Sequence, residues 1–423
     1  MILCKQFLLT LNKTIPHNQH MIMKKLKLFL LICLPVLCYS QSSGIIPIGK
    51  RDSLHSTILS ETRSYFVHLP RNYDNNMFSQ GRYPVLYLLD GDAHFNSVSG
   101  LVEILGGGIN GTHVIPDMIV IAIPNTDRTR DLTPTHTLLD FQNNQQDFFK
   151  TSGGNNNFLH FIKDELIPHI DSSFRTMPYR VFVGHSFGGI TVINALYTIP
   201  ETFNAYIAID PSLWWDHQVL LEKAKTYFLH ANLKGKALYL AQANTLVTGD
   251  TSVNTHFESI KSFATLLETR NRSGLRWKYD YYADDDHGSV PFISEYAGLR
   301  FIFNDYHVHF NEVALHPEKI KEQFSQFSEE AGVQFMPPED VINQLGYNMM
   351  NSKKYDLAIQ YFQMNIEYYP KSANVYDSMG EALMNKGDTK RAIEYYQKSL
   401  QLNPANDNAK QMIKRMQEKK VSQ

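Results

Sequence analysis

One stretch constrains this chain more than any other: Val181-Phe182-Val183-Gly184-His185-Ser186-Phe187-Gly188-Gly189. It reads as a short apolar strand, a G-x-S-x-G turn and the start of an apolar helix, and in that context the pattern indicates a nucleophile elbow. Gly184 and Gly188 lack a Cβ, so strand and helix can approach closely around a strained serine. The first N–H groups of the helix favour developing negative charge. Ser186 is therefore the predicted nucleophile.

Up to about residue 305 the chain alternates apolar strands with helical segments. Two alternating segments, 55–60 and 63–69, suggest antiparallel strands at a sheet edge. The further strands are expected at 83–89, 118–123, 181–183, 206–209, 237–241 and 278–283, and helices at 158–170, 217–230 and 254–272. This alternation predicts an α/β fold with a mostly parallel sheet, helices on both faces and an active site at the carboxyl ends of the strands.

The pattern changes after about Asn304. A polar helical segment is expected at 318–330, and a period of 34 residues follows it. Ile342, Leu345, Gly346, Ala358, Phe362 and Pro370 recur as Tyr376, Met379, Gly380, Ala392, Tyr396 and Pro404. The period and the residue types are those of tetratricopeptide repeats, so two repeats and a cap helix at 407–419 are predicted as a small all-α domain. Two repeats alone are marginal, because each needs a neighbour to bury its face.

Length and charge limit the classes of protein to consider. A chain of 423 residues is long for one domain, and its net charge of −2 with 19% charged residues argues against nucleic-acid binding. The predicted organisation is a leader (1–40), an α/β domain (41–305), a helical connector (306–337) and the repeats with their cap (338–423).

The leader is typical of a secretory signal. Three lysines at 24, 25 and 27 precede an apolar run that is too short to span a bilayer, and small residues follow at its end. We expect cleavage after Ser40, with translation beginning at Met21 or Met23, and a secreted or periplasmic product without a transmembrane segment. Lipoprotein processing before Cys38 is the alternative, although Leu37 fits it poorly. All three cysteines lie in the leader, so the mature protein would have neither a disulfide nor a thiol nucleophile.

An elbow serine needs a base and, in most enzymes, an acid. In α/β-hydrolases the triad follows the chain order serine, acid, histidine, with the histidine on a loop after the last strand. His287 follows the strand that ends at Ala283, so it is the predicted base, with Asp284–Asp286 beside it. His185 lies inside the elbow, and His94 could face the cleft from another loop.

The oxyanion hole requires two N–H donors. One is expected from Phe187, directly after the nucleophile, and the other from the loop after the third strand. In that loop, 88–92, Gly91 permits the turn and Asp92 would supply its backbone N–H, its side chain being incidental.

Five motifs in this order carry a resemblance. They are residues 87–92 (YLLDGD), 127–134 (DRTRDLTP), 184–189 (GHSFGG), 211–215 (PSLWW) and 287–288 (HG). Together they resemble the putative esterase family that contains esterase D and the enterobactin (siderophore) esterases, over about residues 50–305. The resemblance implies an α/β-hydrolase fold and a serine esterase without metal or organic cofactor.

The resemblance also bears on substrate binding and on the acid. Siderophore esterases use basic residues to hold anionic catecholate groups, which implies Arg128 and Arg130 beside a cleft lined by Trp214 and Trp215; salt bridges of the two arginines to Asp127 and Asp131 are the alternative. The family's usual acid position, after the seventh strand, offers only Asp250 within a polar loop. Asp210, which closes the sixth strand, is the first candidate, Asp250 the second, and a Ser-His dyad remains open.

These patterns predict a secreted serine carboxylic-ester hydrolase that works through an acyl-enzyme on a small-molecule ester, with siderophore-like or other aromatic, anionic esters among its substrates. An esterase on acylated polysaccharide or a small thioester is the nearest alternative. A hydrolase-like scaffold whose repeats bind a protein partner is an alternative of a different class.

Overall fold

The computed structural model describes residues 47–421, apart from 76–77, 79–80, 108–110, 248 and 250–251. The predicted leader, with its cleavage site and the three cysteines, lies outside these described residues, and so does Asp250. No helix among the described residues combines the length and the apolar character needed to cross a bilayer.

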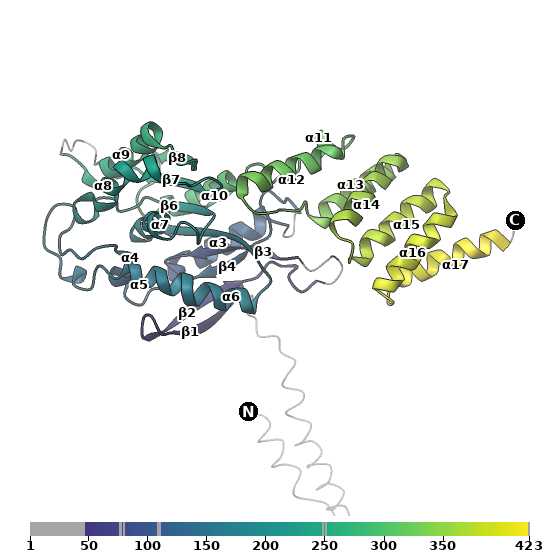
Figure 1. The fold of residues 1–423 in the computed structure, drawn as a ribbon, viewed down its shortest axis with the longest axis horizontal. Helices are drawn as coiled ribbons and strands as arrows, with labels where there is room; N and C mark the ends of the chain where they lie inside the picture. The colour runs from purple at the N-terminus through teal and green to yellow at the C-terminus, as the bar shows by residue number, and fades with distance from the viewer. Residues whose placement is uncertain are drawn as a thin grey trace, which may run out of the picture. The chain divides into compact units, whose positions relative to one another are not determined.

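The described strands form one eight-stranded sheet (Figure 1) in the order β1-β2-β4-β3-β5-β6-β7-β8. Their bounds are β1 Lys50–Ser56, β2 Glu61–His68, β3 Tyr83–Leu88, β4 Ile119–Ala122, β5 Thr176–His185, β6 Ala205–Ile209, β7 Ala237–Ala243 and β8 Arg276–Tyr282. β2 is antiparallel to both of its neighbours, and the remaining pairs are parallel. The mostly parallel sheet predicted from the alternating pattern is confirmed.

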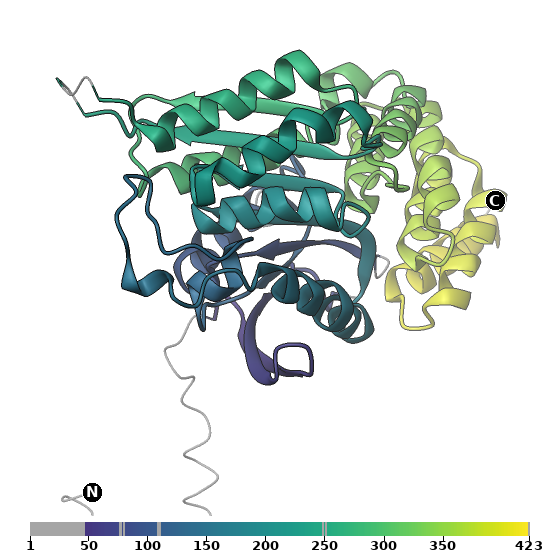
Figure 2. The same cartoon turned by 60° about the vertical axis from the view of Figure 1, so that its left-hand side comes forward.

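Side-chain alternation along the strands builds a hydrophobic core on each face. In β3, for example, Leu86 and Leu88 face one core while Val85 and Tyr87 face the other. The first core is covered by α3 (Gly91–Leu105) and α10 (Val290–Ile302). The second is covered by α5 (Asn155–His160), η4 (Phe161–Leu166), α6 (Ile167–Ser173), α7 (Phe187–Thr198), α8 (Trp215–His230) and α9 (Thr255–Arg270). Figure 2 shows the strands between these two layers of helices.

The edge hairpin differs from its prediction. The strand expected at 55–60 instead ends at Ser56, and residues 57–60 form the turn to β2. Glu165 explains the early end, because its carboxylate accepts hydrogen bonds from the backbone N–H groups of Thr57 (2.8 Å) and Ile58 (3.1 Å). Those N–H groups are thereby satisfied outside the sheet.

The C-terminal helices pair as predicted for tetratricopeptide repeats. After α11 (Phe310–Val313) and α12 (Glu318–Ala331) come α13 (Glu339–Asn351), α14 (Tyr355–Tyr368), α15 (Ala373–Lys386), α16 (Thr389–Leu402) and α17 (Asp407–Val421). A Cβ on Gly346 would lie 2.4 Å from the Phe362 ring, which is why this position must be glycine where α13 meets α14. Figure 1 shows α12 leading from the helices of the α/β domain to the repeats.

The repeats continue the hydrophobic core on the α3–α10 side of the sheet. The ring of Tyr179 in β5 lies 5.2 Å from that of Phe335, just before the repeats, and Tyr306 lies 5.3 Å from Phe324 in α12. The Tyr361 hydroxyl donates to the Val313 carbonyl. From Ile48 onward the chain is one compact unit, so the boundaries at 305/306 and 337/338 stay predictions. The neighbour that the first repeat needs is supplied by α12 and the core of the α/β domain.

An ion pair also links the α/β domain to the first repeat. His113 Nε2 lies 2.9 Å from Asp340 Oδ2, and the His113 side chain is 9% exposed. Burial alone would lower the pKa of His113, but the hydrogen bond and charge of Asp340 outweigh it and raise this pKa. The pKa of Asp340 is lowered, because the same bond outweighs its own burial.

This pair makes the attachment of the repeats depend on pH. A raised histidine pKa contributes stability that is complete below the unfolded value of about 6.5 and is lost as pH rises through the folded pKa. We therefore expect His113→Gln to lower the melting temperature by about 1–3 °C at pH 6, and by less at pH 8.5. Differential scanning calorimetry of both proteins at the two pH values measures this, with the exposed His160→Gln as control. An equal loss at both pH values would contradict the account.

Candidate active site

The elbow has the backbone that the sequence predicts. Ser186 stands between β5 and α7 with φ 60° and ψ −114°, a conformation that side chains rarely adopt. A Cβ on Gly184 would lie 2.4 Å from the Gly188 carbonyl carbon and oxygen, so only glycine fits where strand and helix meet. The turn is held from β6, because the Ser186 N–H donates to the Ile209 carbonyl at 3.0 Å. Strain at this serine is thus imposed by the surrounding sheet.

Asp210 and His287 meet at the same edge of the sheet. Asp210 follows β6, is fully buried and has φ 39°. Its Oδ1 accepts the Ala243 N–H at 2.9 Å, while its Oδ2 lies 2.5 Å from His287 Nδ1. His287 comes from the loop after β8. Of the acid candidates, the structure brings Asp210 to the histidine; Asp250 lies outside the described residues.

A second histidine, which the sequence analysis missed, shares the same carboxylate oxygen. His256 Nε2, near the start of α9, lies 2.9 Å from Asp210 Oδ2 and is buried. Burial alone would raise the pKa of Asp210, but the hydrogen bonds from His256 and His287 outweigh it and hold this pKa well below its usual range. Asp210 is therefore a fixed anion that two rings hold from different elements.

Ser186 and His287 line one cleft of about 540 Å³. No hydrogen bond joins these two described side chains; the Ser186 Oγ lies 3.3 Å from the Ser212 Oγ instead. Ser212 is buried, and its N–H donates to the Ser186 carbonyl at 3.1 Å. Catalytic hydrogen bonds are often long in free enzymes and tighten when substrate binds. The arrangement can pass a proton from a serine to an imidazole whose far nitrogen is held by a carboxylate.

Aromatic side chains form much of the cleft wall. They are Phe141, Phe148, Phe149, Phe187 and Trp214. The Trp214 ring lies 5.6 Å from that of Phe141 and 6.1 Å from that of Phe187. Trp215, expected beside it, does not line the cleft: it is buried behind it, and its indole N–H donates to the Thr135 carbonyl at 3.2 Å.

The expected oxyanion donors lie at helix starts. Phe187 is the first residue of α7 and Asp92 the second of α3, positions whose N–H groups have no acceptor within their own helix. The Asp92 side chain has a use that the sequence did not suggest, because its Oδ1 accepts from the Asn125 side-chain amide at 3.2 Å.

The two arginines of the 127–134 motif have different surroundings. Arg128 lines the cleft and is held bidentately by Asp90, with Nε–Oδ1 at 2.6 Å and Nη2–Oδ2 at 3.0 Å. Arg130 is not among the residues that line this cleft. Its guanidinium contacts Asp131 (2.7 Å) and Glu61 (2.6 Å), so the salt-bridge alternative describes Arg130. For Arg128 the partner is Asp90, which was not foreseen.

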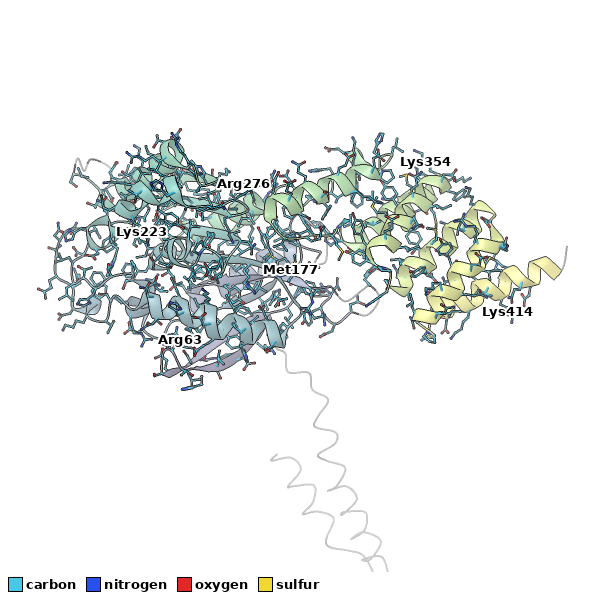
Figure 3. The ribbon with its side chains drawn as sticks, viewed as in Figure 1. Arg63, Met177, Lys223, Arg276, Lys354 and Lys414 are labelled. Carbon is cyan, nitrogen blue, oxygen red and sulfur yellow. The ribbon has the colours of Figure 1, made fainter. Side chains whose placement is uncertain are left out.

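Arg130 belongs to a network that fixes its loop. Arg63 of β2, labelled in Figure 3, is almost fully buried and its Nη1 contacts the same two carboxylates, Asp131 at 2.5 Å and Glu61 at 2.9 Å. Two guanidinium groups and two carboxylates thus neutralise one another between β2 and α4 (Arg128–Leu132). A structural role explains these charges.

The remaining histidines of the region lie beside the cleft. His185 is a ring neighbour of His287 at 4.5 Å, and burial together with the charges of His287 and His94 lowers its pKa to about 3. It is neutral at physiological pH. His94, on α3, contacts Glu295 at 3.2 Å and does not line the cleft.

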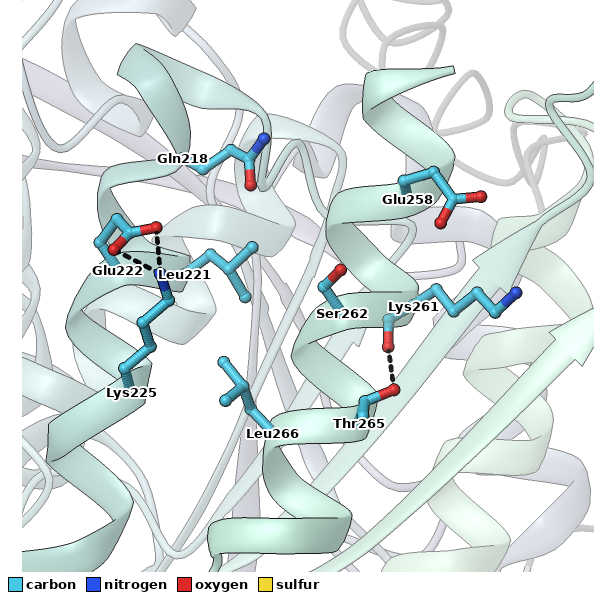
Figure 4. Close-up of a pocket in the computed structure, with 9 residues that line it drawn as sticks. All are labelled: Gln218, Leu221, Glu222, Lys225, Glu258, Lys261, Ser262, Thr265 and Leu266. Carbon is cyan, nitrogen blue, oxygen red and sulfur yellow. Dashed lines mark hydrogen bonds and ion pairs between the residues drawn. The ribbon is translucent and has the colours of Figure 1, made fainter. Parts of the chain in front are cut away.

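A second hollow of about 500 Å³ lies between α8 and α9 (Figure 4). It is lined by exposed side chains such as Lys225, which pairs with Glu222 at 2.7 Å. Its lining contains neither histidine nor nucleophile beyond the solvent-exposed hydroxyls of Ser262 and Thr265. Chemistry is therefore expected at the elbow.

Comparison with known proteins gives matches for both regions. Residues 56–275 match the family described as "Putative esterase", and residues 344–372 and 373–406 each match tetratricopeptide repeat families. The chain is 29% identical over 271 residues to the ferri-bacillibactin esterase BesA of Bacillus subtilis, covering 61% of this chain and 87% of that protein. It is 27% identical over 253 residues to a siderophore enterobactin esterase of Emericella nidulans, covering 52% and 82%.

A solved structure has a similar fold. It is an IroE-like serine hydrolase from Shewanella oneidensis, which superposes with a TM-score of 0.68 at 32% identity, over 76% of this chain and 99% of that one. The α/β-hydrolase fold expected from the elbow and the strand series is confirmed.

Proposed function

The chain belongs to the putative esterase family and is an esterase, and from this premise we propose that it is a secreted serine carboxylic-ester hydrolase with Ser186, His287 and Asp210 as its catalytic residues. One observation carries the proposal. The His287 Nδ1 lies 2.5 Å from the Asp210 Oδ2, and His287 lines the cleft that contains the strained elbow serine.

In the acylation step, His287 Nε2 takes the proton of the Ser186 hydroxyl as Oγ attacks the ester carbonyl carbon. The Nδ1–H of the ring donates to Asp210, which fixes this tautomer and stabilises the imidazolium that forms. The N–H groups of Phe187 and Asp92 hold the developing oxyanion. Collapse of the tetrahedral intermediate expels the alkoxide, which takes the proton from His287, and leaves the acyl group on Ser186.

Deacylation repeats these steps with water as the nucleophile. His287 takes a proton from water, hydroxide adds to the acyl carbon, and the serine leaves with that proton. The Ser212 hydroxyl lies 3.3 Å from Ser186 Oγ, and both serines line the cleft.

The substrate class proposed is a siderophore-like or other aromatic, anionic ester. The names of two similar proteins describe siderophore esterases, and the cleft carries five aromatic side chains on which rings can stack. Arg128 adds a directed positive group. Asp90 accepts from its Nε and Nη2, while no hydrogen bond to any described residue uses its Nη1. Nη1 is thus available to a catecholate oxygen.

Arg128 and Arg130 form a matched pair for testing this class. We expect Arg128→Lys to raise KM for a catecholate ester about tenfold more than KM for a neutral acetyl ester, because only the anionic substrate uses the planar donor. Arg130→Lys, outside the cleft, should affect both esters alike and mainly lower the melting temperature. Steady-state kinetics on the two esters measures the split. If Arg128→Lys changes KM equally for the two esters, the proposed siderophore-like substrate class is contradicted and only the proposal of a serine esterase stands.

A substrate screen tests the proposal as a whole. The purified mature protein is offered a triscatecholate lactone, acetylated and feruloylated sugars, an acyl thioester and short p-nitrophenyl esters, with Ser186→Ala alongside. Turnover of the lactone well above the rest supports the proposed class, whereas preference for acylated sugars or the thioester favours the alternatives. The proposal of a secreted or periplasmic protein is supported by residues 24–40, and the N-terminal sequence of the exported protein tests it; Gln41 is expected.

A protein partner at the repeats remains a second proposal. Tetratricopeptide repeats are present in the chain, and such helix pairs build concave binding surfaces. Packing of the repeats on the hydrolase core is the competing explanation, and under it the binding of no partner would be lost when exposed side chains of the repeats are replaced.

A further inference from the structure

Asp210 contacts two histidines, one more than the proposed triad uses. In the proposed reaction its Oδ2 needs only His287, yet His256 also contacts this oxygen, at 2.9 Å. Donor atoms of the three side chains all lie within 4.8 Å of one another. Two imidazole nitrogens and one carboxylate oxygen are a ligand set that suits Zn²⁺, which binds such atoms at about 2.0–2.2 Å.

We propose that Asp210, His256 and His287 form a zinc site whose occupation switches the esterase off. The inference rests on the proposed function only for its inhibitory part, because inhibition presumes that His287 is the base. Binding itself depends on the three ligands alone.

The surroundings suit a reversible site. Asp210 and His256 are buried and fixed, the first by the Ala243 N–H and the second by its helix. His287 is on a loop and its side chain is 42% exposed, so it can shift. Ligand atoms of a tetrahedral zinc ion are about 3.3 Å apart. The 2.5 Å contact between His287 Nδ1 and Asp210 Oδ2 must therefore lengthen by about 1 Å. The ion enters through the cleft that His256 and His287 line, and water completes its coordination.

Zinc would stop the reaction by fixing the wrong tautomer. In the proposed reaction the His287 Nδ1 carries a proton and donates to Asp210, 2.5 Å away, which leaves the Nε2 lone pair to accept the serine proton. A metal on Nδ1 needs the lone pair there, so the proton moves to Nε2. An Nε2–H group is a donor and cannot accept the serine proton. The His256 proton moves from Nε2 to Nδ1 in the same way, so each neutral ring keeps one proton.

Binding is measured first without catalysis. The purified mature Ser186→Ala protein, which lacks the leader cysteines, is titrated with zinc chloride by competition with a chromogenic chelator, and one Zn²⁺ per chain is expected. Adding His256→Gln should weaken zinc binding at least about 100-fold. Even the substitution of groups that only hold metal ligands in place lowers metal affinity about 10–100-fold. His160→Gln, an exposed histidine far along the chain, is the matched control and should change nothing. Equal affinity with and without His256, or no binding, would overturn the site.

Inhibition is measured on the wild-type chain. The rate of fluorophosphonate labelling of the serine should fall with zinc occupancy and return on addition of EDTA, and His256→Gln, whatever its own rate, should lose this zinc sensitivity. Zinc that binds through His256 without slowing the labelling overturns the switch but leaves the site. If the protein binds zinc as described but the metal-free protein hydrolyses no ester, the proposed function is contradicted and the zinc site is not.

Discussion

Ser186→Ala is expected to lower kcat for ester hydrolysis by about 10⁶-fold, because removal of the nucleophile of a serine–histidine unit leaves only the oxyanion donors and binding. The fold should persist, since the only hydrogen bond of the Oγ to a described residue is the one of 3.3 Å to Ser212. Steady-state kinetics and circular dichroism measure the two effects.

Ser212→Ala is the matched control for this serine. It removes the neighbouring hydroxyl, which positions the nucleophile but forms no bond to substrate carbon, so a loss of at most about 100-fold is expected. If Ser212→Ala abolishes activity and Ser186→Ala does not, the nucleophile has been assigned to the wrong hydroxyl.

Asp210→Asn is expected to lower kcat by about 10⁴-fold, with little change in KM. The amide keeps the shape of the carboxylate but allows the wrong tautomer of His287 and cannot stabilise its cation. Because the pKa of Asp210 is depressed in the folded protein, its carboxylate contributes stability above the unfolded pKa, and this contribution is lost as pH falls through the folded value. The variant should therefore also unfold more readily at pH 7, by thermal melting.

Asp250→Asn tests the alternative acid and should change kcat by less than about threefold, a change too small for an acid that orients the base. The opposite ranking would move the acid to the loop after β7. If neither substitution matters, the site is a Ser-His dyad, and the short Asp210–His287 contact serves only the structure of the loop.

Much of the fold could be predicted because its signals are local. The elbow combines a strand, three glycines and a serine within nine residues, and the continuous apolar runs of β3 and β4 require burial on both faces. The 34-residue period predicted the repeats, since Gly346 and Gly380 mark the same close approach in each unit. His287 was predicted by its place after the last strand.

The contacts that complete the site could not be predicted, because they join residues that are distant in sequence. His256 reaches Asp210 only when α9 packs beside β7, and neither residue lies in a pattern that signals the other. Arg128 pairs with Asp90, 38 positions earlier, whereas sequence reasoning considered only its chain neighbours. The end of β1 depends on Glu165, which lies more than 100 positions from the turn that it caps.

In the proposed reaction Ser186 carries the acyl group during turnover. The most direct test is rapid acid quenching of the wild-type protein during hydrolysis of a slowly deacylated ester, followed by peptide mass spectrometry. One acyl adduct per chain is expected, on the Ser186 hydroxyl, and none in Ser186→Ala or with substrate omitted. An adduct on another residue, or steady hydrolysis with no adduct under conditions in which the products show a burst, would contradict it.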